Sequence, residues 1–542
     1  MPPRRLEELR DPVAFTVDGE EVLAERGESV ATALVAAGRL LLGRSVKYHR
    51  PRGPACFEGR CDGCLMRVDG VPNVMTCQAE ARAGMEVETQ NVLGTVRADV
   101  LALTDWFFPE GMDHHHMFTR FGPVNRVMQK VARRVAGVGT IPDGARAPIA
   151  PRDARVDVLV IGGGRSGLEA ANAAAREGAS VWLVEAEQLG AAAAARGEGV
   201  PAPGPPVEVR EGTLAVGVFD EVGFGFTTGE PEPAEPVRWV LLEDARGLIR
   251  LRPRALVVAT GAFAGAEAFA GNDRPGVLSP RAALRLLDAG VLVGQRVALV
   301  GAGPELERAA ARLKAAGAET LGPFEASGVD AVGGRPSVRY LRVGETKHAC
   351  DAVVSAAPPT GAYVLAGQAG AGLRFDGRGF LVAADEHGRT AHPAVFAAGR
   401  CTGRVGEGAA RQAREAGRGA ARVARGEVPA AFTPERPSPA PAERGALPRS
   451  ASDKVVVCRC EDVTLHELEE AVARGHRDLE AAKRYTGFAT GWCQGKQCVS
   501  LCARALAALG GEVADAPITP RPPLRPVPLA ELARLVDDGE GA

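Results

Sequence analysis

The fold of this chain is decided by VDVLVIGGG (156–164), an apolar run that ends in three consecutive glycines. Such a run predicts a buried strand that enters a glycine turn. The residues after the turn predict a helix, and SVWLVEAE (180–187) predicts the next strand, so the segment forms one βαβ unit with parallel strands. An α/β fold is therefore expected at the centre of the chain.

The glycines of this turn follow the pattern G-x-G-x-x-G, and an acid follows at the spacing of a dinucleotide-binding unit. Gly162 allows the tight turn, Gly164 lets a pyrophosphate approach the backbone, and Gly167 lets the helix pack on the strand. Glu185 ends the second strand, 23 residues after Gly162, and can bind a ribose diol. A glycine turn that holds no ligand is the alternative.

Two later strand ends open into glycine loops and favour FAD over NAD for this unit. The first is ATG (259–261), which supplies Thr260 and Gly261. The second is AAGRCTG (397–403), which supplies Gly399. Together with the G-x-G-x-x-G turn, these loops predict FAD as the bound dinucleotide.

These motifs resemble the superfamily of two-dinucleotide-domain flavoproteins that includes the disulfide reductases and the ferredoxin reductases. In that superfamily an aspartate after the late glycine holds the ribityl chain of the flavin, whereas this sequence has Arg400. The loop LGAAAAARGEGVPAPG (189–204) also departs from the usual pattern. FAD remains the expected cofactor, and the details of its binding stay open.

A second strand, turn and helix begin at RVALVGAGP (296–304), with Gly301 and Gly303 in place. The third glycine of the motif is replaced by Leu306, and no acid or arginine stands clearly at the end of the next strand, AETLGPFEA (318–326). In the superfamily this subdomain binds NAD(P)H. Here a nicotinamide cofactor, another adenine nucleotide and a vestigial site all remain open.

Nine of the eleven cysteines fall in two groups at opposite ends of the chain, which favours metal or redox chemistry over disulfides. The first group has the spacing C-x4-C-x2-C-x12-C and consists of Cys56, Cys61, Cys64 and Cys77. It resembles the 2Fe–2S ferredoxin-type β-grasp domains, and VDGEEVLAERGESVATAL (17–34) predicts the hairpin and helix of that fold. Gly59 and Gly63 permit the sharp turns of the loop. A zinc site is the alternative.

The second group resembles the helical 2Fe–2S domain of bacterioferritin-associated ferredoxin. It consists of Cys458, Cys460, Cys493 and Cys498. Lys483 and Arg484 match the basic, glycine-rich approach of that family, and cationic neighbours would raise the potential of an anionic cluster. Cys502 is expected to be a buried helix residue, with a ligand exchange as the alternative.

The remaining candidate residues predict packing rather than chemistry. Cys350 and Cys401 each stand alone, without a CxxC partner, and we expect both to be structural. The three histidines of MDHHHM (112–117) cannot all face one ion from regular structure, so we expect them to pack in a connector.

The composition is that of an ordinary soluble globular protein, with a formal net charge of −2 that gives no reason to expect nucleic acid or an anionic membrane as partner. The first residues lack the apolar core of a signal peptide, and no apolar run approaches the roughly 18–20 residues of a transmembrane segment. We expect a cytoplasmic protein, with peripheral attachment to a membrane through partners as the alternative.

The predicted organisation is an α/β multidomain chain with an iron–sulfur domain at each end of a Rossmann-like FAD/NAD unit. The expected segments are an N-terminal tail (1–12), a β-grasp domain (13–92), a connector (93–150), the flavoprotein unit (151–430) with its second Rossmann unit inserted at about 294–385, a Pro-rich linker (431–450), a helical 2Fe–2S domain (451–511) and a tail (512–542).

This order of domains resembles the α subunits of heteromeric amino-acid dehydrogenases and oxidases, among them sarcosine oxidase, proline and hydroxyproline dehydrogenases, opine oxidases and hydrogen cyanide synthase. The resemblance covers about residues 13 to 530, including GNDRPGV (271–277), KRYTGFATGWCQGKQC (483–498) and RPPLRPVPLAELA (521–533). It implies FAD, two 2Fe–2S clusters and a separate flavin-containing β subunit of amine-oxidase type. The folate-binding module of the sarcosine oxidase α subunit is not found, so we expect no one-carbon transfer to tetrahydrofolate.

The predicted function is electron relay, from an amine oxidised on the β subunit to a quinone-linked or soluble acceptor. No catalytic residue for amine chemistry is identified in this sequence. The cysteine groups are expected to place one-electron carriers on either side of the flavin. Two alternatives remain: a self-sufficient NAD(P)H:acceptor reductase of the ferredoxin-reductase type, and a non-catalytic scaffold, to which Arg400 and Leu306 point.

Overall fold

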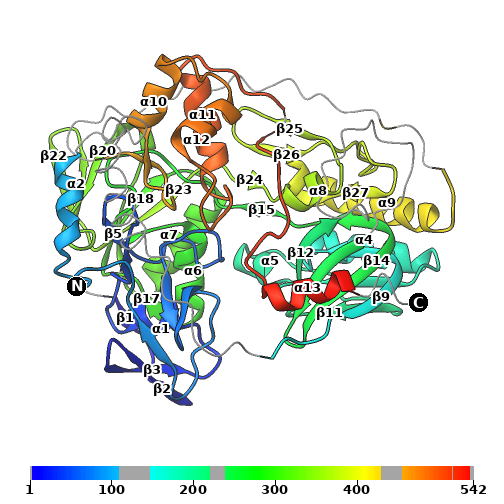
Figure 1. Ribbon diagram of the computed structural model, residues 1–542, viewed down its shortest axis with the longest axis horizontal. Helices are drawn as coiled ribbons and strands as arrows, with labels where there is room; N and C mark the ends of the chain where they lie inside the picture. Colours follow the sequence, from blue (N-terminus) through cyan, green and yellow to red (C-terminus); the bar gives the residue numbers. More distant parts are fainter. Residues whose placement is uncertain are drawn as a thin grey trace. The chain divides into compact units, whose positions relative to one another are not determined.

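The computed structural model describes residues 3–108, 147–219, 239–428, 432, 454–515 and 517–537 (Figure 1). The chain divides into two compact units, each assembled from three separate segments. The first unit contains Met1–Ala145, Ala264–Pro358 and Ala442–Val513, and the second contains Arg146–Phe263, Pro359–Pro441 and Ala514–Ala542. Apart from residue 432, the predicted Pro-rich linker lies outside the described residues, and so do the three consecutive histidines.

The second unit is built on a seven-stranded sheet in the order β11-β10-β9-β14-β13-β12, with β27 paired to β14. The neighbours β11, β10, β9, β14 and β27 are parallel, and β12, β13 and β14 form an antiparallel meander. The strands are β9 (Arg152–Ile161), β10 (Val181–Val184), β11 (Val207–Arg210), β12 (Leu214–Phe219), β13 (Trp239–Asp244), β14 (Gly247–Val258) and β27 (Val395–Ala397).

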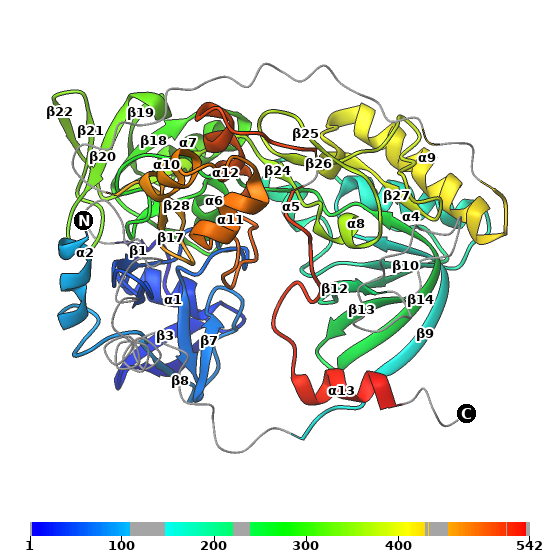
Figure 2. The ribbon, with the colours of Figure 1, turned by 45° about the horizontal axis from the view of Figure 1, so that its top comes forward.

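Helices α4 (Arg165–Arg176) and α9 (Gly406–Ala424) lie beside each other in this unit (Figure 2). Their facing surfaces are rich in alanine, and they bury a core with β9, β10 and β14. A Cβ on Gly417 would lie 2.1 Å from the carbonyl oxygen of Ala170, so the close approach of the helices requires glycine there. This packing fixes the start of α4, where the first glycine turn ends.

The sequence after the Pro-rich linker also contributes to the second unit. Helix α13 (Leu529–Asp537) places Leu535 in a cluster with Val216, Leu241 and Leu248, and Arg250 donates to the carbonyl of Leu535 at 2.9 Å. Helix α13, within the predicted C-terminal tail, is therefore packed on the sheet. The remaining elements are α5 (Ala191–Ala195), β15 (Ala262–Phe263), β24 (Thr360–Gly361), α8 (Val364–Gln368), β25 (Leu373–Phe375), β26 (Phe380–Val382) and η3 (Gly399–Thr402).

The N-terminal part of the first unit is a five-stranded sheet in the order β3-β2-β8-β6-β7, with α1 packed beside it. The inner pair β2/β8 is parallel and the hairpins β2/β3 and β6/β7 are antiparallel, which is the predicted β-grasp arrangement. The elements are β2 (Pro12–Val17), β3 (Glu20–Glu25), α1 (Val30–Ala36), β6 (Leu65–Val68), β7 (Val71–Met75) and β8 (Glu86–Glu88), followed by η1 (Val100–Ala102) and α2 (Leu103–Phe107).

The middle segment of this unit is a small parallel α/β layer in the order β16-β23-β18-β19, with a three-stranded antiparallel sheet inserted in sequence between β19 and β23. It begins at Ala264 and ends at Pro358, so it differs at both ends from the predicted 294–385. Its elements are β16 (Val277–Leu278), α6 (Pro280–Asp288), β17 (Val291–Leu292), β18 (Arg296–Gly301), α7 (Pro304–Ala315), β19 (Glu319–Phe324), η2 (Ala326–Gly328), β20 (Val329–Gly333), β21 (Tyr340–Val343), β22 (Thr346–Ala349) and β23 (Ala352–Ala356).

One hydrophobic cluster joins the β-grasp part to the middle segment. It contains Phe15 and Leu34 from the first and Leu286 and Val297 from the second, all at most 1% exposed. The predicted N-terminal tail also contacts the middle segment, because β1 (Arg4–Arg5) pairs with β17. The two parts are therefore one packed body.

The last part of the first unit is small and mostly helical. A hairpin of β28 (Val456–Cys458) and β29 (Val463–Thr464) leads to α10 (Leu465–Ala473), α11 (Leu479–Thr486) and α12 (Cys498–Ala508). Thr464 and Glu467 form a capping box at the start of α10, as the sequence TLHE allows. No helix among the described residues has the length and apolarity that a bilayer crossing requires.

Candidate functional site

The N-terminal thiol set, Cys56, Cys61, Cys64 and Cys77, is buried in the first unit. The Cys56 side chain lies within hydrogen-bonding reach of Cys61 and Cys77, and Cys77 reaches Cys64. The structure therefore brings all four predicted residues together. Backbone N–H groups of Glu58 and Arg60 point at Cys56 Sγ, each at 3.4 Å.

The loop that carries these thiols depends on two glycines for different reasons. Gly59 has a φ of 63°, in the left-handed region that glycine adopts at little cost. Gly63 is needed for space, because a Cβ there would lie 2.1 Å from the carbonyl oxygen of Gly53. Both glycines were expected from the sequence to permit sharp turns, and the close approach to Gly53 was not.

Cys56 and Cys61 are poor acids in these surroundings unless a cation binds them. The neighbouring Cys61 lowers the pKa of Cys56, but Cys77 and burial outweigh it and raise the pKa to about 12. The hydrogen bond with Cys56 and burial also raise the pKa of Cys61 well above its usual range, and the nearby Arg459 opposes that rise. A thiolate forms in such a place when a metal supplies the positive charge, so the donor set fits an iron–sulfur cluster.

The C-terminal thiol set, Cys458, Cys460, Cys493 and Cys498, is also buried. Cys493 lies within hydrogen-bonding reach of Cys460 and Cys498, and Cys498 reaches Cys458. The contacts with Cys460 and Cys498 hold the pKa of Cys493 well below its usual range. Cys502 is one turn along α12 from Cys498, is fully buried and also contacts it.

Lys496 is a cation beside this set that was not singled out from the sequence. Lys483 and Arg484 pair with Glu480 on their own helix, and Arg484 is exposed. Lys496, in contrast, donates to the carbonyl of Cys493 at 3.2 Å, and its charge helps to lower the Cys493 pKa, after the two thiol contacts and a backbone N–H. The sequence CQGKQC could have identified Lys496 as a neighbour of the thiol set, because it lies between the predicted ligands Cys493 and Cys498.

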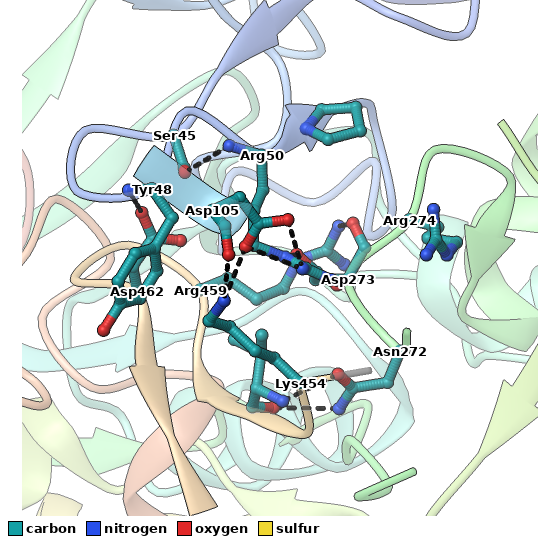
Figure 3. Close-up of polar contacts among 12 residues, drawn as sticks. Ser45, Tyr48, Arg50, Asp105, Asn272, Asp273, Arg274, Lys454, Arg459 and Asp462 are labelled. Carbon is teal, nitrogen blue, oxygen red and sulfur yellow. Dashed lines mark hydrogen bonds and ion pairs between the residues drawn. The ribbon is translucent and has the colours of Figure 1, made fainter. Parts of the chain in front are cut away.

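Both thiol sets lie in the first unit, and a buried network of ion pairs joins their loops (Figure 3). Arg52 donates to Asp273 at 2.6 Å and to the carbonyl of Arg459 at 3.2 Å, and it pairs with Asp462 and, at 3.5 Å, with Asp62. The expectation that the cysteine groups lie on either side of the flavin is wrong, because one side chain contacts both loops.

The first glycine turn, in the second unit, has the geometry that its sequence predicts. Gly162 has a φ of 111°, and a Cβ on Gly167 would lie 1.7 Å from the carbonyl oxygen of Gly162. Gly164 precedes α4 without a side-chain cap, and a Cβ there would meet no atom within 4 Å. The open space beside Gly164, at uncapped N–H groups, fits a dinucleotide pyrophosphate.

The carboxylate of Glu185 contacts the backbone of this turn. One carboxylate oxygen accepts from the N–H of Gly163 at 2.6 Å, and the other accepts from the N–H of Glu187 at 3.0 Å. Each oxygen keeps a further lone pair for a ribose hydroxyl. The backbone thus orients the acid that the sequence assigns to the ribose.

Thr260, Gly261 and Gly399 lie at strand ends of the same unit. Thr260 donates to the carbonyl of Ala362 at 2.7 Å, and Gly261 has a φ of 74° with open space beside it. A Cβ on Gly399 would lie 2.5 Å from Ser166 Oγ, so this loop approaches the start of α4. The predicted loop residues and the glycine turn are therefore neighbours.

The two departures from the flavoprotein pattern contact each other. Arg400, in place of the usual aspartate, donates to Glu198 at 2.7 Å, and Glu198 belongs to the unusual loop 189–204. Arg196 pairs with the same carboxylate at 3.0 Å. Burial would raise the pKa of Glu198, but both arginines outweigh it and lower the pKa. The positive charge that Arg400 introduces is thus paired with the negative charge of Glu198.

The second glycine turn, in the first unit, keeps two of the three motif glycines, and an acidic residue stands at the start of the helix that follows it. Gly301 and Gly303 have φ values of 90° and 120°. Leu306, in the third motif position, is a buried core residue at 3% exposure. Glu305, in the first turn of α7, pairs with Arg281 at 2.9 Å. An acid at this helix start competes with a phosphate for the same positive end of the dipole.

Cys350 and Cys401 have the surroundings of structural thiols. Cys350 is buried in the core around β20 and β21. The thiol of Cys401 contacts the carbonyls of Ala398 and Val258 at 3.2 and 3.4 Å. Burial raises the pKa of each to about 12.

Within the described ranges, no three His, Cys, Asp or Glu side chains are arranged to hold a single metal ion.

Three family models match separate parts of the chain. Residues 10–92 match the 2Fe-2S iron-sulfur cluster binding domain, 157–215 the FAD binding domain, and 452–534 the Sarcosine oxidase A3 domain. The predictions of an N-terminal iron–sulfur domain and an FAD-binding domain are thereby confirmed. The third match covers the C-terminal thiol set and reaches into α13.

Curated relatives match most or part of the chain. It is 30% identical to the alpha subunit of sarcosine oxidase from Rhizobium meliloti (strain 1021) over 96% of this chain, and it spans 58% of that protein's length. It is 25% identical to a subunit of opine oxidase from Agrobacterium tumefaciens (strain Ach5), over 52% of this chain and 69% of that one. The crystal structure of L-proline dehydrogenase from P. horikoshii has the same fold, with a TM-score of 0.72, 22% identity, and coverage of 98% and 100%.

Two glycines of the first turn allow a matched test of this site. Gly164→Ala should fold normally and lose flavin several-fold, because its new methyl group enters the space left for the pyrophosphate. Gly167→Ala should instead lower the free energy of unfolding by about 1–3 kcal/mol, because its methyl group overlaps the Gly162 carbonyl. The variant should therefore melt at a lower temperature. Flavin absorbance per protein and thermal unfolding measure both; full flavin content in Gly164→Ala would contradict the assignment.

Proposed function

We propose that this chain, which is similar to the alpha subunit of sarcosine oxidase and to a subunit of opine oxidase, relays electrons within a heteromeric dehydrogenase or oxidase of amino acids or secondary amines. The observation that carries this proposal is the presence of two buried four-thiol sets in one compact unit. Amine substrates of the sarcosine, proline, hydroxyproline or opine type are the class that the relatives suggest.

The N-terminal thiol set holds the first 2Fe–2S cluster in this proposal. The domain match supports the cluster, and the two N–H groups aimed at Cys56 support these particular ligands. Hydrogen bonds to the sulfurs of a cluster are one of the means by which a protein sets its potential. The loop around Cys56 thus both holds the metal and adjusts its affinity for an electron.

The C-terminal thiol set holds a second 2Fe–2S cluster, in a small helical domain of the bacterioferritin-associated-ferredoxin kind. Its support is the burial and mutual contact of four cysteines with Lys496 beside them. Cys502 remains a neighbour of the set and not a ligand. When bound, the flavin exchanges electrons in pairs and the clusters exchange them singly, which lets a two-electron oxidation feed one-electron carriers.

Amine oxidation itself takes place on a partner in this proposal. The relatives are named as subunits, which supports a heteromeric complex. The partner is a flavin-containing β subunit of amine-oxidase type, and the acceptor is a quinone-linked or soluble carrier. FAD occupies the turn formed by Gly162, Gly164 and Gly167, with Glu185 at its ribose and Thr260, Gly261 and Gly399 in the neighbouring loops.

The second candidate function is a self-sufficient NAD(P)H:acceptor reductase, which Gly301 and Gly303 favour. Glu305 and Glu307 in the first turn of α7, together with Pro304 as its first residue, favour a turn without a nucleotide. Arg281 pairs with Glu305 and also with Glu58, at 3.4 Å, so the two carboxylates share its one positive charge. We therefore propose that this turn is structural and that electrons enter through a partner.

The relay is tested on the full chain, purified without oxygen, alone and with a co-expressed β subunit. We expect bound flavin and iron, and we expect an amine from a screen of sarcosine, proline, hydroxyproline and opines to bleach the flavin only when the partner is present. Rapid turnover of an artificial acceptor by the chain alone with NADH would establish the reductase instead. A colourless chain without iron would point to a scaffold.

The second cluster has its own test, in two cysteines of the same small domain. Cys493→Ser should lose about half of the iron, since it removes one ligand of one of two clusters. Cys502→Ser is the matched control, because it removes an equally buried thiol from the same region. Iron content and visible absorbance measure both. Equal iron loss in the two variants would place Cys502 among the ligands.

The proposal that the second glycine turn binds no nucleotide can be tested by removing a charge from it. NADH should bind the flavin-loaded chain weakly, and Glu305→Gln should strengthen that binding several-fold, because it removes a negative charge from the start of α7. Glu319→Gln, at the exposed start of β19, is the control and should change nothing. Titration with NADH by calorimetry gives the affinities. Tight binding by the unmodified chain would show that the turn is a nucleotide site.

A further inference from the structure

We propose that the two iron–sulfur sites form one directly coupled pair inside the first unit, and that Arg52 is the positioning residue that joins them. The inference rests on the proposed function, because it requires both thiol sets to hold clusters. It adds that electrons pass between the two sites without passing through the flavin.

On the N-terminal side, the contact is made through Asp62. This residue lies between Cys61 and Cys64 in sequence, and its carboxylate is 3.5 Å from Arg52 Nε. Both side chains are buried, with 2% of Arg52 and 9% of Asp62 exposed. The guanidinium therefore lies next to the loop that carries the N-terminal thiol set.

On the C-terminal side, the same guanidinium contacts two residues of the other loop. Its Nη2 atom donates to the carbonyl of Arg459 at 3.2 Å, and Arg459 lies between Cys458 and Cys460. Arg52 also pairs with Asp462, two residues beyond Cys460. The Arg52 side chain thus contacts Asp62 of the N-terminal loop and both Arg459 and Asp462 of the C-terminal loop.

Asp273 completes the network from the middle segment. It accepts from Arg50 at 2.7 and 2.8 Å and from Arg52 at 2.6 Å, and its carbonyl accepts from Arg459 at 2.9 Å. Figure 3 shows Arg50 pointing at Asp273, and Asp462 beside Tyr48 on the other side of the same network. The chain between the two thiol sets thereby fixes the distance between them.

The two sets also interact electrostatically across this network. Arg459, from the C-terminal loop, acts on the Cys61 thiol, and Asp62, from the N-terminal loop, interacts with Cys460 and Cys493. A cavity of about 240 Å³ has Arg52, Asp62 and Cys460 together in its wall. The sites are close enough for the charge of one to act on the other.

A buried ion network is a poor device for stability, because desolvation offsets most of the attraction, and its best-attested use is to fix one arrangement. Here the arrangement that it fixes is the position of two thiol loops relative to each other. A positive charge between two sites that become more negative on reduction also raises both potentials. Arg52 therefore positions the sites and eases the entry of an electron into either one.

The first test is electron paramagnetic resonance of the full chain reduced by dithionite, which supplies one electron to each cluster. We expect the signals of the fully reduced protein to be split or broadened relative to the spectrum of Cys493→Ser, which keeps only the N-terminal cluster. A spectrum equal to the sum of two isolated centres would overturn the inference while leaving the proposed function intact. Absence of iron would overturn both.

The second test uses redox titration of two variants with opposite charge changes. Arg52→Gln should shift both midpoint potentials to more negative values, and Asp62→Asn, a milder change, should shift both to more positive values. Arg82→Gln, in an exposed pair with Asp69, is the control and should shift neither. A structural role alone would lower the melting temperature without opposite shifts at both sites. A shift confined to one site, or absent, in the variants that fold would overturn the role of Arg52.

Discussion

The first unit depends on the burial of one guanidinium among carboxylates from three separate parts of the chain. Arg52, Asp273 and Asp462 are each at most 2% exposed, and they come from the N-terminal, middle and C-terminal segments. Taking such charges out of water costs several kcal/mol for each ion, and only close partners offset that cost. Loss of one partner leaves a buried charge uncompensated, at a cost of about 3–5 kcal/mol. The three segments are therefore stable in one mutual arrangement.

Apolar packing supplies the stability that this network does not. The cluster that joins the β-grasp part to the middle segment contains side chains such as Phe15, Leu34, Leu286 and Val297, which are almost fully removed from water. Aliphatic cores tolerate changes of partner when volume is kept, so they specify a position less strictly than directional ion pairs do. The apolar cluster thus holds the parts together, and the ion pairs select their register. In the proposed relay, the register of the thiol loops sets the distance between the two cluster sites.

The local parts of this molecule could be predicted from its sequence, and their assembly could not. Gly162, Gly164 and Gly167 each have the geometry that their motif requires, because the requirement lies within a few residues. The β-grasp hairpin and the grouping of four thiols follow from spacing in the same way. Arg52 gave no such signal, since its partner Asp462 is 410 residues away. The pairing of Arg400 with Glu198 was hidden for the same reason, although both departures from the pattern were visible singly.

The two glycine turns of the chain show how one motif serves two purposes. At α4 the first turn has no acid and the motif glycine before it opens onto free space, so the positive end of the helix dipole is left for a phosphate. At α7 the first turn contains Glu305 and Glu307, and the dipole is already met by the chain's own carboxylates. Arg281 balances Glu305 and also pairs with Glu58, which lies two residues after Cys56. One charge that would repel a nucleotide at α7, that of Glu305, is therefore linked through Arg281 to the loop that carries the N-terminal thiol set. In the proposed function the second Rossmann turn has a structural contact in place of a ligand, and Arg281 links its helix to the loop that carries Cys56.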